Sequence, residues 1–491
     1  MLKHHNLETG ITQKVMPVVY EKSFCVVWKG RNVLAKQKMT QEEKVNYMTT
    51  KAVPPLICEL AVPTIISMLV TAFYNMADTF FVGKINTQST AAVGIVFTVM
   101  ALIQSCGFFF GHGTGNYISR KLGAREYEDA EVMAATGFYM AFICGVILGV
   151  LGLVFLDPLA VLLGSTPTIL PYAREYLRII LIGTPFMMSS FVLNNQLRFQ
   201  GSASYAMVGI VTGAAVNIVL DPVFIFVFKM GVAGAALATV LSQVISFIML
   251  YIGSMHGGNI RIRIKNFNPS FSSLYEIARG GFPSLCRQGL ASISGIFLNH
   301  MAGSYGGIHG DAAIAAMSIV TRVTMFANSA LIGFGQGFQP VCGMNYGAKK
   351  YERVREGYWF CVKYAFLFLL IVAMAGFVFA EPIIALFRKD DVQVIRIGTL
   401  ALRLHCVAFP LSAWIVMCNM MLQSMGRATK ASIVAAARQG LFFIPLIFIL
   451  PRLFGLFGVQ VCQMIADIGS FVLALPIGLS ELKALRKEGE E

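Results

Sequence analysis

Charged residues are scarce in this chain. Asp, Glu, Lys and Arg make up 13% of its 491 residues, whereas hydrophobic residues make up 56%, and the mean hydropathy is +0.68. Soluble globular domains carry about 25% charged residues. Apolar segments of about 20 residues, long enough to cross a hydrocarbon core about 30 Å thick, recur along the whole chain. The composition therefore predicts an all-α polytopic membrane protein.

Motifs that would mark several enzyme classes are missing. The sequence contains no HExxH, GxSxG or GxxxxGK(S/T) pattern, so zinc hydrolysis, an esterase triad and direct use of ATP have no support. The ten cysteines are scattered and form no CxxC pair, which favours reduced, packed side chains over disulfides or metal ligands. We therefore expect neither enzymatic activity nor a cofactor.

Twelve apolar segments predict twelve transmembrane helices. They span residues 54–83, 88–116, 130–156, 172–198, 204–229, 231–254, 273–302, 312–341, 357–381, 394–424, 430–450 and 455–480. Basic residues concentrate in the loops after the even-numbered segments, such as Arg120 and Lys121 after the second. The positive-inside rule then places both termini in the cytoplasm. The net charge of +14 thus reflects topology and does not require nucleic acid.

Polar segments flank and divide this pattern. Residues 1–53 are polar and basic, without a compact apolar core, and predict a disordered cytoplasmic tail with no cleavable signal. Residues 255–272 contain glycines, serines and a proline, as expected of a cytoplasmic linker between two lobes, 54–254 and 273–480. Residues 481–491 are expected to form a second cytoplasmic tail.

The two halves of the chain repeat each other. Gly123 is matched by Gly347 at an offset of 224 (347 − 123), and Pro63 by Pro283 at an offset of 220 (283 − 63). Because each half holds an even number of spans, both halves have the same orientation and are related by a pseudo-two-fold axis along the membrane normal. Two six-helix lobes of this kind are a common scaffold for alternating access.

Asp221 is the most informative polar residue. It lies within an apolar run, where an ionised carboxylate costs at least about 2.5–3.5 kcal/mol, so an intramembrane acid indicates a functional site. Asn217 precedes it by four residues on the same helical face. Pro222 follows it and disfavours regular helix at that point, which leaves a main-chain carbonyl without its usual donor. This combination suits a proton or cation site.

Two further helices present polar side chains at the same expected depth. Asp78 lies near the end of the first span and Thr239 near the start of the sixth. At 1.5 Å per residue, Asp78, Asp221 and Thr239 lie roughly 8–12 Å below the outer surface. Two carboxylates in one dry pocket repel each other, which favours protonation of at least one of them. Tyr74, Asn194 and Gln243 are the candidates for a substrate cavity, and Asn194 is expected deeper than the acids.

The second half lacks these acids. The positions that match Asp78 and Asp221 are about Leu298 and Pro445. Asp467 takes the place of Gln243, and an ion pair of Asp467 with Arg287 or Arg438 is one interpretation of its burial. The coupling machinery is therefore expected mainly in the first lobe.

At these residues the chain resembles the multidrug and toxic compound extrusion (MATE) family. The resemblance rests on Asn75-Met-Ala-Asp78, on Gly111-His-Gly-Thr-Gly115 and above all on Asn217-Ile-Val-Leu-Asp221-Pro222, and it extends from about Pro54 to Ser480. It implies a drug–cation antiporter of the bacterial inner membrane, similar to the DinF-like or MepA-like branch. In that branch the cation-responsive residues fall on Asp78, Asn217, Asp221 and Thr239, and drug-cavity residues on Tyr74 and Asn194.

The resemblance departs from a second branch. The NorM-like transporters carry extra acids in spans 7 and 10, whereas this chain has only Glu276, at the entry of span 7, and no acid in span 10. A sodium site in the second lobe therefore has little support, and Asp78 and Asp221 are the candidate ligands if the coupling ion is Na⁺.

The leading hypothesis is a monomeric efflux antiporter that exchanges organic cations for protons or sodium ions across the bilayer. The alternative is a flippase for lipid-linked precursors, whose pyrophosphate needs cationic residues such as Arg287, Arg403 and Arg438. A channel is less favoured, because a duplicated architecture with broken helices suits a carrier.

Overall fold

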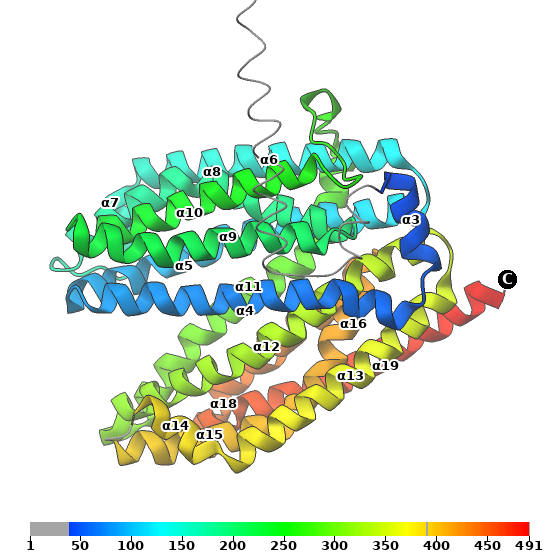
Figure 1. The fold of residues 1–491 in the computed structure, drawn as a ribbon. Helices are drawn as coiled ribbons and strands as arrows, with labels where there is room; N and C mark the ends of the chain where they lie inside the picture. The colour runs from blue at the N-terminus through cyan, green and yellow to red at the C-terminus, as the bar shows by residue number, and fades with distance from the viewer. Residues whose placement is uncertain (1–38, 389–390, 491) are drawn as a thin grey trace, which may run out of the picture.

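The chain folds into two helical lobes. The computed structural model describes residues 39–388 and 391–490, and every regular element within those ranges is a helix. Figure 1 shows the first lobe, coloured blue to green, lying against the second lobe, coloured light green to red. This arrangement confirms the predicted all-α, two-lobe fold class.

The helices follow the predicted order. The first lobe contains α4 (Val53–Gly83), α5 (Thr87–Gly123), α6 (Tyr127–Val154), α7 (Leu156–Leu162), α8 (Leu170–Phe199), α9 (Ala203–Pro222), η1 (Val223–Val227) and α10 (Gly231–Ser254). The second contains α11 (Phe271–Tyr305), α12 (Gly310–Gly347), α13 (Tyr351–Val378), α14 (Ala380–Phe387), α15 (Val392–Ala408), η4 (Phe409–Leu411), α16 (Ser412–Ser424), α17 (Ala428–Ala436), η5 (Ala437–Phe443), α18 (Ile444–Phe454) and α19 (Leu456–Glu490). Short 3₁₀ turns, η2 (Ile264–Asn266) and η3 (Gly307–His309), lie in the connections before α11 and α12.

Eleven membrane-spanning helices in the described ranges are long and apolar enough to cross a bilayer by length and composition. The twelfth is α11, which is 35 residues long but more polar, because it carries Arg279, Arg287 and Gln288. Pro222 and Pro410 lie where two spans change their helical type, to a π-helix and a 3₁₀ turn respectively. Such local changes are expected where proline removes a main-chain donor.

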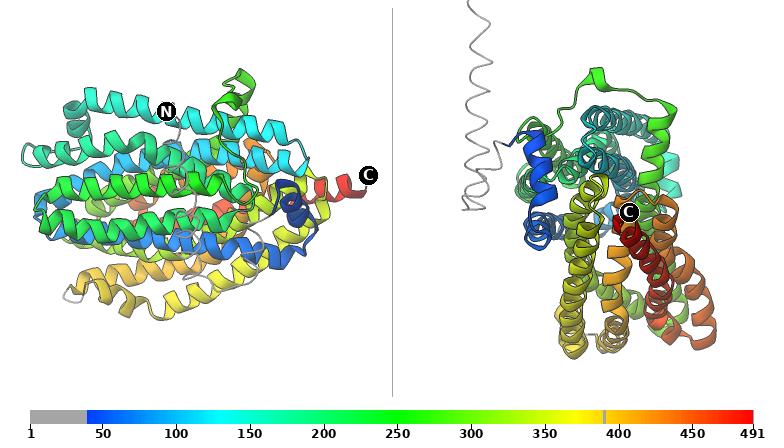
Figure 2. Two further views of the ribbon diagram at one scale, coloured as in Figure 1. Left: turned by 45° about the horizontal axis from the view of Figure 1, so that its top comes forward. Right: turned by 90° about the vertical axis from the view of Figure 1, so that its right-hand side faces the viewer.

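The lobes pack tightly at one end of the molecule. In Figures 1 and 2 this end carries α3 (Gln41–Thr50) and the C-terminus, and the opposite end carries α7 and α14. We call them the α3 end and the α7 end. Near the α3 end a Cβ on Gly123 would lie 2.0 Å from the Met344 oxygen, and one on Gly347 would lie 2.0 Å from the Arg120 oxygen. Only glycine allows the backbones to approach this closely.

These two close contacts obey the repeat. Gly347 is the counterpart of Gly123, and Met344 is the counterpart of Arg120, both at an offset of 224 (347 − 123 and 344 − 120). The turn after each glycine is also shared, because Arg125 and its counterpart Lys349 have positive φ angles of 64° and 58°. The interface between the lobes therefore has the pseudo-two-fold symmetry expected from the sequence.

The expected N-terminal tail requires a correction. Residues 1–38 lie outside the described residues, but α3 is a regular helix with a capping box between Thr40 and Glu43. It contacts both lobes. Lys44 Nζ donates to Ser202 Oγ at 2.6 Å in the first lobe, and Asn345 Nδ2 in α12 donates to the Met48 oxygen at 3.2 Å. Hydropathy did not indicate this helix, because the segment is rich in charge and only three of its residues, Val45, Met48 and Thr49, are buried.

The expected C-terminal tail also differs from the structure. Helix α19 continues ten residues beyond the predicted end at Ser480, to Glu490. Glu481 is only 4% exposed and forms ion pairs with Lys430 and with Arg427, the latter at 3.5 Å. These ion pairs hold a polar helical extension against α17 where hydropathy alone predicts an end.

Candidate functional site

Asp221 occupies the last turn of α9. Its side chain is 0% exposed, and one carboxylate oxygen accepts a hydrogen bond from Asn217 Nδ2 at 3.2 Å. The other oxygen, and the Asn217 amide oxygen, are buried without a hydrogen-bond partner among the described residues. Unsatisfied buried oxygens cost free energy. The Asn217–Asp221 pair is therefore arranged to accept a proton or to coordinate a cation.

The local backbone changes directly after this pair. Pro222 has no main-chain N–H and clashes with the preceding turn of a regular helix. The chain continues as the π-helix η1, in which Phe228 N donates to the Val223 oxygen at 2.9 Å. Single turns of π-helix within α-helices are frequent at functional sites. The predicted break at Pro222 is confirmed in this form.

Asp78 approaches the same point from α4. Its carboxylate and that of Asp221 lie close enough to repel each other, and Tyr74 lies one turn away beside Asp78. One oxygen of Asp78 is buried without a partner among the described residues. The structure thus brings together two acids that are 143 positions apart (221 − 78). Their role in coupling stays a prediction.

Tyr176 in α8 is a member of this group that the sequence did not indicate. It is fully buried, its hydroxyl lies 4.0 Å from the Met100 sulfur, and it lies near Thr239 in α10 and within electrostatic range of Asp78 and Asp221. Its neighbours Arg174, Glu175 and Arg178 make this part of the span rich in charge. A buried tyrosine usually finds a hydrogen-bond partner for its hydroxyl, which was the available signal.

We use the term acid cluster for Asp78, Asn217, Asp221, Thr239 and Tyr176. It is built from four helices, α4, α8, α9 and α10. All its polar atoms are oxygens or amide groups, which suit a proton or a hard cation such as Na⁺. Within the described residues no group of three or more His, Cys, Asp and Glu side chains gathers at one point.

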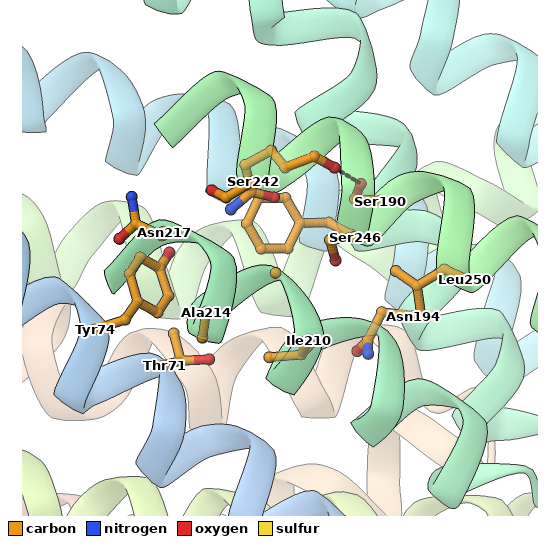
Figure 3. Close-up of a pocket in the computed structure, with 13 residues that line it drawn as sticks. Thr71, Tyr74, Ser190, Asn194, Ile210, Ala214, Asn217, Ser242, Ser246 and Leu250 are labelled. Atoms are coloured by element: carbon orange, nitrogen blue, oxygen red, sulfur yellow. Dashed lines mark hydrogen bonds between the residues drawn. The ribbon is translucent and has the colours of Figure 1, made fainter. Parts of the chain in front are cut away.

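A small cavity lies next to the acid cluster inside the first lobe. Figure 3 shows Tyr74 and Asn217 at one end of it and Asn194 with Leu250 at the other. The cavity is also lined by Gln243, so all three predicted substrate-cavity residues border it. Asn194 Nδ2 donates to the Ala206 oxygen at 3.1 Å, which fixes its amide at the deep end. The structure shows that these three residues line the cavity, but their role in binding a substrate remains a prediction.

The cavity is small in this conformation. Its volume is about 40 Å³, enough for a few water molecules but not for a drug, whose pockets measure about 300–1,000 Å³. The polar side chains Thr71, Ser190, Ser242 and Ser246 share the lining with apolar ones. A larger ligand requires the helices around it to move.

The second lobe holds an ion pair at the matching place. Arg438 Nε and Nη2 donate to the two oxygens of Asp467 at 2.7 and 3.2 Å, and Gln463 donates to the same carboxylate at 2.8 Å. Of the two pairings that the sequence left open, the structure contains Arg438–Asp467 and not Arg287–Asp467. Arg438 lies in η5, a π-helix that begins about ten residues, or nearly three helical turns, earlier in its span than η1 does.

The cysteines in the described ranges are reduced and packed among helices, as predicted. Nine of the ten are free thiols within apolar helices, and Cys25 lies outside the described residues. Cys342, Cys361 and Cys418 are fully buried and act as small hydrophobic side chains.

Comparison with known proteins gives a consistent result. The sequence model of a family described as MatE matches residues 63–223 and 283–449, two segments that begin at the paired prolines Pro63 and Pro283. The multidrug export protein MepA of Staphylococcus haemolyticus (strain JCSC1435) is 29% identical over 441 residues, covering 89% of this chain and 95% of that protein. MepA of Staphylococcus aureus (strain N315) is 28% identical over 429 residues, covering 87% and 94%.

Solved structures share the whole fold. One described as the outward-facing conformation of a multidrug resistance MATE family transporter has a TM-score of 0.83 and 30% sequence identity, and the match covers 89% of this chain and 99% of that one. Another, described as MATE in the straight conformation, has a TM-score of 0.83 at 30% identity and covers 90% and 98%.

Proposed function

The chain belongs to the MatE family of transporters, and from this premise we propose that it is a secondary active multidrug efflux antiporter. It exports organic cations and related amphipathic drugs through the cell membrane in exchange for protons or sodium ions. The observation that carries this proposal is the acid cluster, in which the carboxylates of Asp78 and Asp221 lie within electrostatic range of each other beside a small cavity with a partly polar lining. The curated relatives are multidrug export proteins, which supports the substrate class.

The acid cluster supplies the exchange chemistry. When Asp78 and Asp221 are both ionised, their repulsion is relieved by a proton, by Na⁺ or by the positive charge of a drug in the adjacent cavity. These cations therefore compete for the same negative charge. Asn217 orients the Asp221 carboxylate through its hydrogen bond, and the hydroxyls of Thr239 and Tyr176 offer additional oxygen ligands. When the charge of Asp78 and Asp221 changes, the surrounding helices move, and this movement changes the size of the cavity.

The structure corresponds to a state closed at the α3 end. The close glycine contacts and the hydrogen bond from Thr64 Oγ1 to the Gly333 oxygen, 2.6 Å long, join the lobes on that side. The basic residues in the loops at the α3 end support a cytoplasmic position for that end. Both termini are then cytoplasmic, and the acid cluster lies toward the external face. An ion can bind from outside in this state and be released inward after the lobes rearrange.

Replacing Gly347 with Ala tests this closed contact. The added Cβ would lie 2.0 Å from the Arg120 main-chain oxygen, so the lobes must separate at the α3 end, and overpacking of this kind costs about 1–3 kcal/mol. If this cost falls on the closed state, drug export should fall roughly five- to a hundredfold. The measurement is the rate of drug efflux from cells that contain equal amounts of protein.

Gly94 is the matched control for this substitution. It lies in the spanning helix α5, and a Cβ at that position meets nothing within 4 Å. The Gly94→Ala variant is expected to export drug at the normal rate. Normal export by Gly347→Ala at normal abundance would mean that the closed contact at the α3 end is not needed for transport.

The direct test of the proposed function uses purified protein in sealed vesicles. A proton gradient and a sodium gradient are imposed separately, and the movement of rhodamine 123 against its concentration gradient is followed by fluorescence. We expect accumulation with at least one gradient and none without. Drug movement that is identical with and without gradients would replace the antiporter with a passive carrier or channel.

The flippase hypothesis loses two of its three arginines. It depended on Arg287, Arg403 and Arg438, but Arg438 is neutralised by Asp467, and Arg403 is exposed and packs on Phe377, with Nε 3.3 Å from the Phe377 oxygen. A strain that lacks the protein should therefore retain drugs and should not accumulate lipid-linked precursors. The reverse result would restore the flippase.

A further inference from the structure

Arg198 is a buried cation held only by neutral groups. It lies at the end of α8 and is 1% exposed. Its guanidinium donates to the side-chain oxygens of Gln336 in α12 and of Asn195. Its Nε–H has no hydrogen-bond partner among the described residues. The Arg198–Gln336 bond crosses from the first lobe to the second, so this cation lies at the interface between the lobes.

His112 in α5 completes the neutral surroundings of Arg198. Its Nδ1 lies 3.2 Å from the Phe108 oxygen, so Nδ1 carries the hydrogen and Nε2 is left as an acceptor. Nε2 lies 3.4 Å from Nη2 of Arg198. The imidazole is therefore arranged as a neutral acceptor and does not compensate the charge.

Arg287 is a second cation near the same place. It lies near the middle of α11 in the second lobe, and α11 packs closely on α5 one to two turns before it, where a Cβ on Gly281 would lie 2.2 Å from the Phe109 oxygen. Its charge acts on both Arg198 and His112. It is half-buried, and no ion pair or hydrogen bond of its guanidinium occurs within residues 39–388 and 391–490.

Two like charges without a counter-charge are costly at this depth. Burying one ion costs several kcal/mol after relaxation, and the neighbouring positive charge adds to that cost. Arg438 in the same chain has the usual counter-charge, because the Asp467 carboxylate lies 2.7 Å from its Nε. Arg198 and Arg287 lack such a counter-charge within the described residues. Arginine is also the side chain best suited to bind carboxylate or phosphate groups.

We propose that Arg198 and Arg287 form an anion-binding site between the lobes, which takes the carboxylate or phosphate group of an amphipathic molecule. Arg287, which is partly exposed, contacts the anion, and Arg198 supplies a fixed positive field behind it. The site is separate from the acid cluster. It extends the proposed substrates from cations to zwitterions, whose positive part suits the acids and whose negative part suits the two arginines. The extension to substrates rests on the proposed export function, but anion binding itself does not.

Two dyes that differ in one group test the site. Rhodamine 110 carries a free carboxylate, and rhodamine 123 is its methyl ester with the same ring system. Binding to the purified full chain in phosphatidylcholine nanodiscs is measured by fluorescence anisotropy without any gradient. The wild type is expected to bind the acid at least as tightly as the ester. In Arg287→Gln, affinity for the acid should fall at least about tenfold, as loss of a charge-assisted hydrogen bond predicts, while the ester changes less than about threefold.

Variants with matched chemistry separate charge from packing. Arg287→Lys keeps the charge and should recover most of the affinity for rhodamine 110. Arg403→Gln removes an arginine of the same lobe that lies far from the proposed site in the fold, and should change neither dye. Unchanged binding of the ester shows that the variant proteins remain folded.

A second arm distinguishes a soluble anion from an anionic lipid. Phosphatidylglycerol is added to the nanodiscs, and lipid retained by the protein is counted by native mass spectrometry. If headgroups occupy the site, phosphatidylglycerol is retained by the wild type in preference to phosphatidylcholine and weakens rhodamine 110 binding, and Arg287→Gln removes both effects. Absence of any preference for anions that depends on Arg287, in both arms, overturns the proposal. A protein that binds the acid but does not move drugs with a gradient would instead refute only the antiporter.

Discussion

Gradient-driven drug uptake into vesicles should fall more than about tenfold when Asp221 is replaced by Asn. The substitution keeps the size of the side chain and its contact with Asn217, which donates to Asp221 at 3.2 Å. It removes the negative charge that a proton or Na⁺ would neutralise. Exchange requires the ion and the drug to compete for that charge. The variant should therefore remain folded but lose the coupling between ion binding and drug binding.

Two comparisons make this result specific. Glu381→Gln removes an exposed acid in the first turn of α14 and should transport normally. Asp78→Asn should weaken coupling less than Asp221→Asn does, because Asp78 is only half-buried whereas Asp221 is 0% exposed. Full gradient-driven uptake by Asp221→Asn, at normal abundance in the vesicles, would remove the acid cluster from the mechanism.

The largest effect on stability is expected at the Arg438–Asp467 pair. Asp467→Ala leaves the Arg438 guanidinium as an uncompensated charge, and breaking a buried pair in this way lowers the free energy of unfolding by about 3–5 kcal/mol. Thermal unfolding of the purified protein in detergent should show a midpoint lower by several degrees. The double variant Arg438→Met/Asp467→Leu removes both charges and should recover most of the loss.

The exposed pair Arg174–Asp157 is the matched reference for this measurement. Both side chains are about half exposed, at 54% and 46%, so Arg174→Gln should change the free energy of unfolding by no more than about 1 kcal/mol. If Asp467→Ala is as mild as Arg174→Gln, the ion pair in the second lobe does not stabilise the fold. If the double variant is as unstable as the single one, the loss comes from packing.

This ion pair is also a structural difference between the two lobes. Arg438 is the counterpart of Ala214 and Asp467 of Gln243, both at an offset of 224 (438 − 214 and 467 − 243). Ala214 and Gln243 line the cavity of the first lobe. The duplicated place in the second lobe is therefore occupied by a salt bridge. The shared backbone thus holds the proposed ion-exchange site in one lobe and a buried salt bridge in the other.

The parts of the site that were predictable are those set by local spacing. Asn217 and Asp221 are four residues apart on one helix, so their contact follows from helical geometry. Eleven of the spans in the described ranges follow from hydropathy, and the symmetry of the lobes follows from paired residues such as Gly123 and Gly347. Each of these features depends on short stretches of sequence or on their repetition.

The parts that were not predictable depend on tertiary packing. Tyr176 joins the acid cluster because α8 packs against α10 and brings its side chain near Thr239. Arg438, rather than Arg287, pairs with Asp467 because η5 packs against α19. Helix α3 forms because both lobes contact it. Neither hydropathy nor charge along the chain carries this information.

The exchange between ion and drug at the acid cluster is tested most directly by measuring the ions released when a drug binds. Rhodamine 123 is added to purified protein in weakly buffered, sodium-free solution near neutral pH, and released protons are counted with a pH dye. About one proton should be released for each dye bound, or, if the coupled ion is Na⁺, added sodium should weaken dye binding. The variant Asp78→Asn/Asp221→Asn should show neither effect. Dye binding by the wild type without proton release and without any influence of sodium would contradict exchange at these two carboxylates.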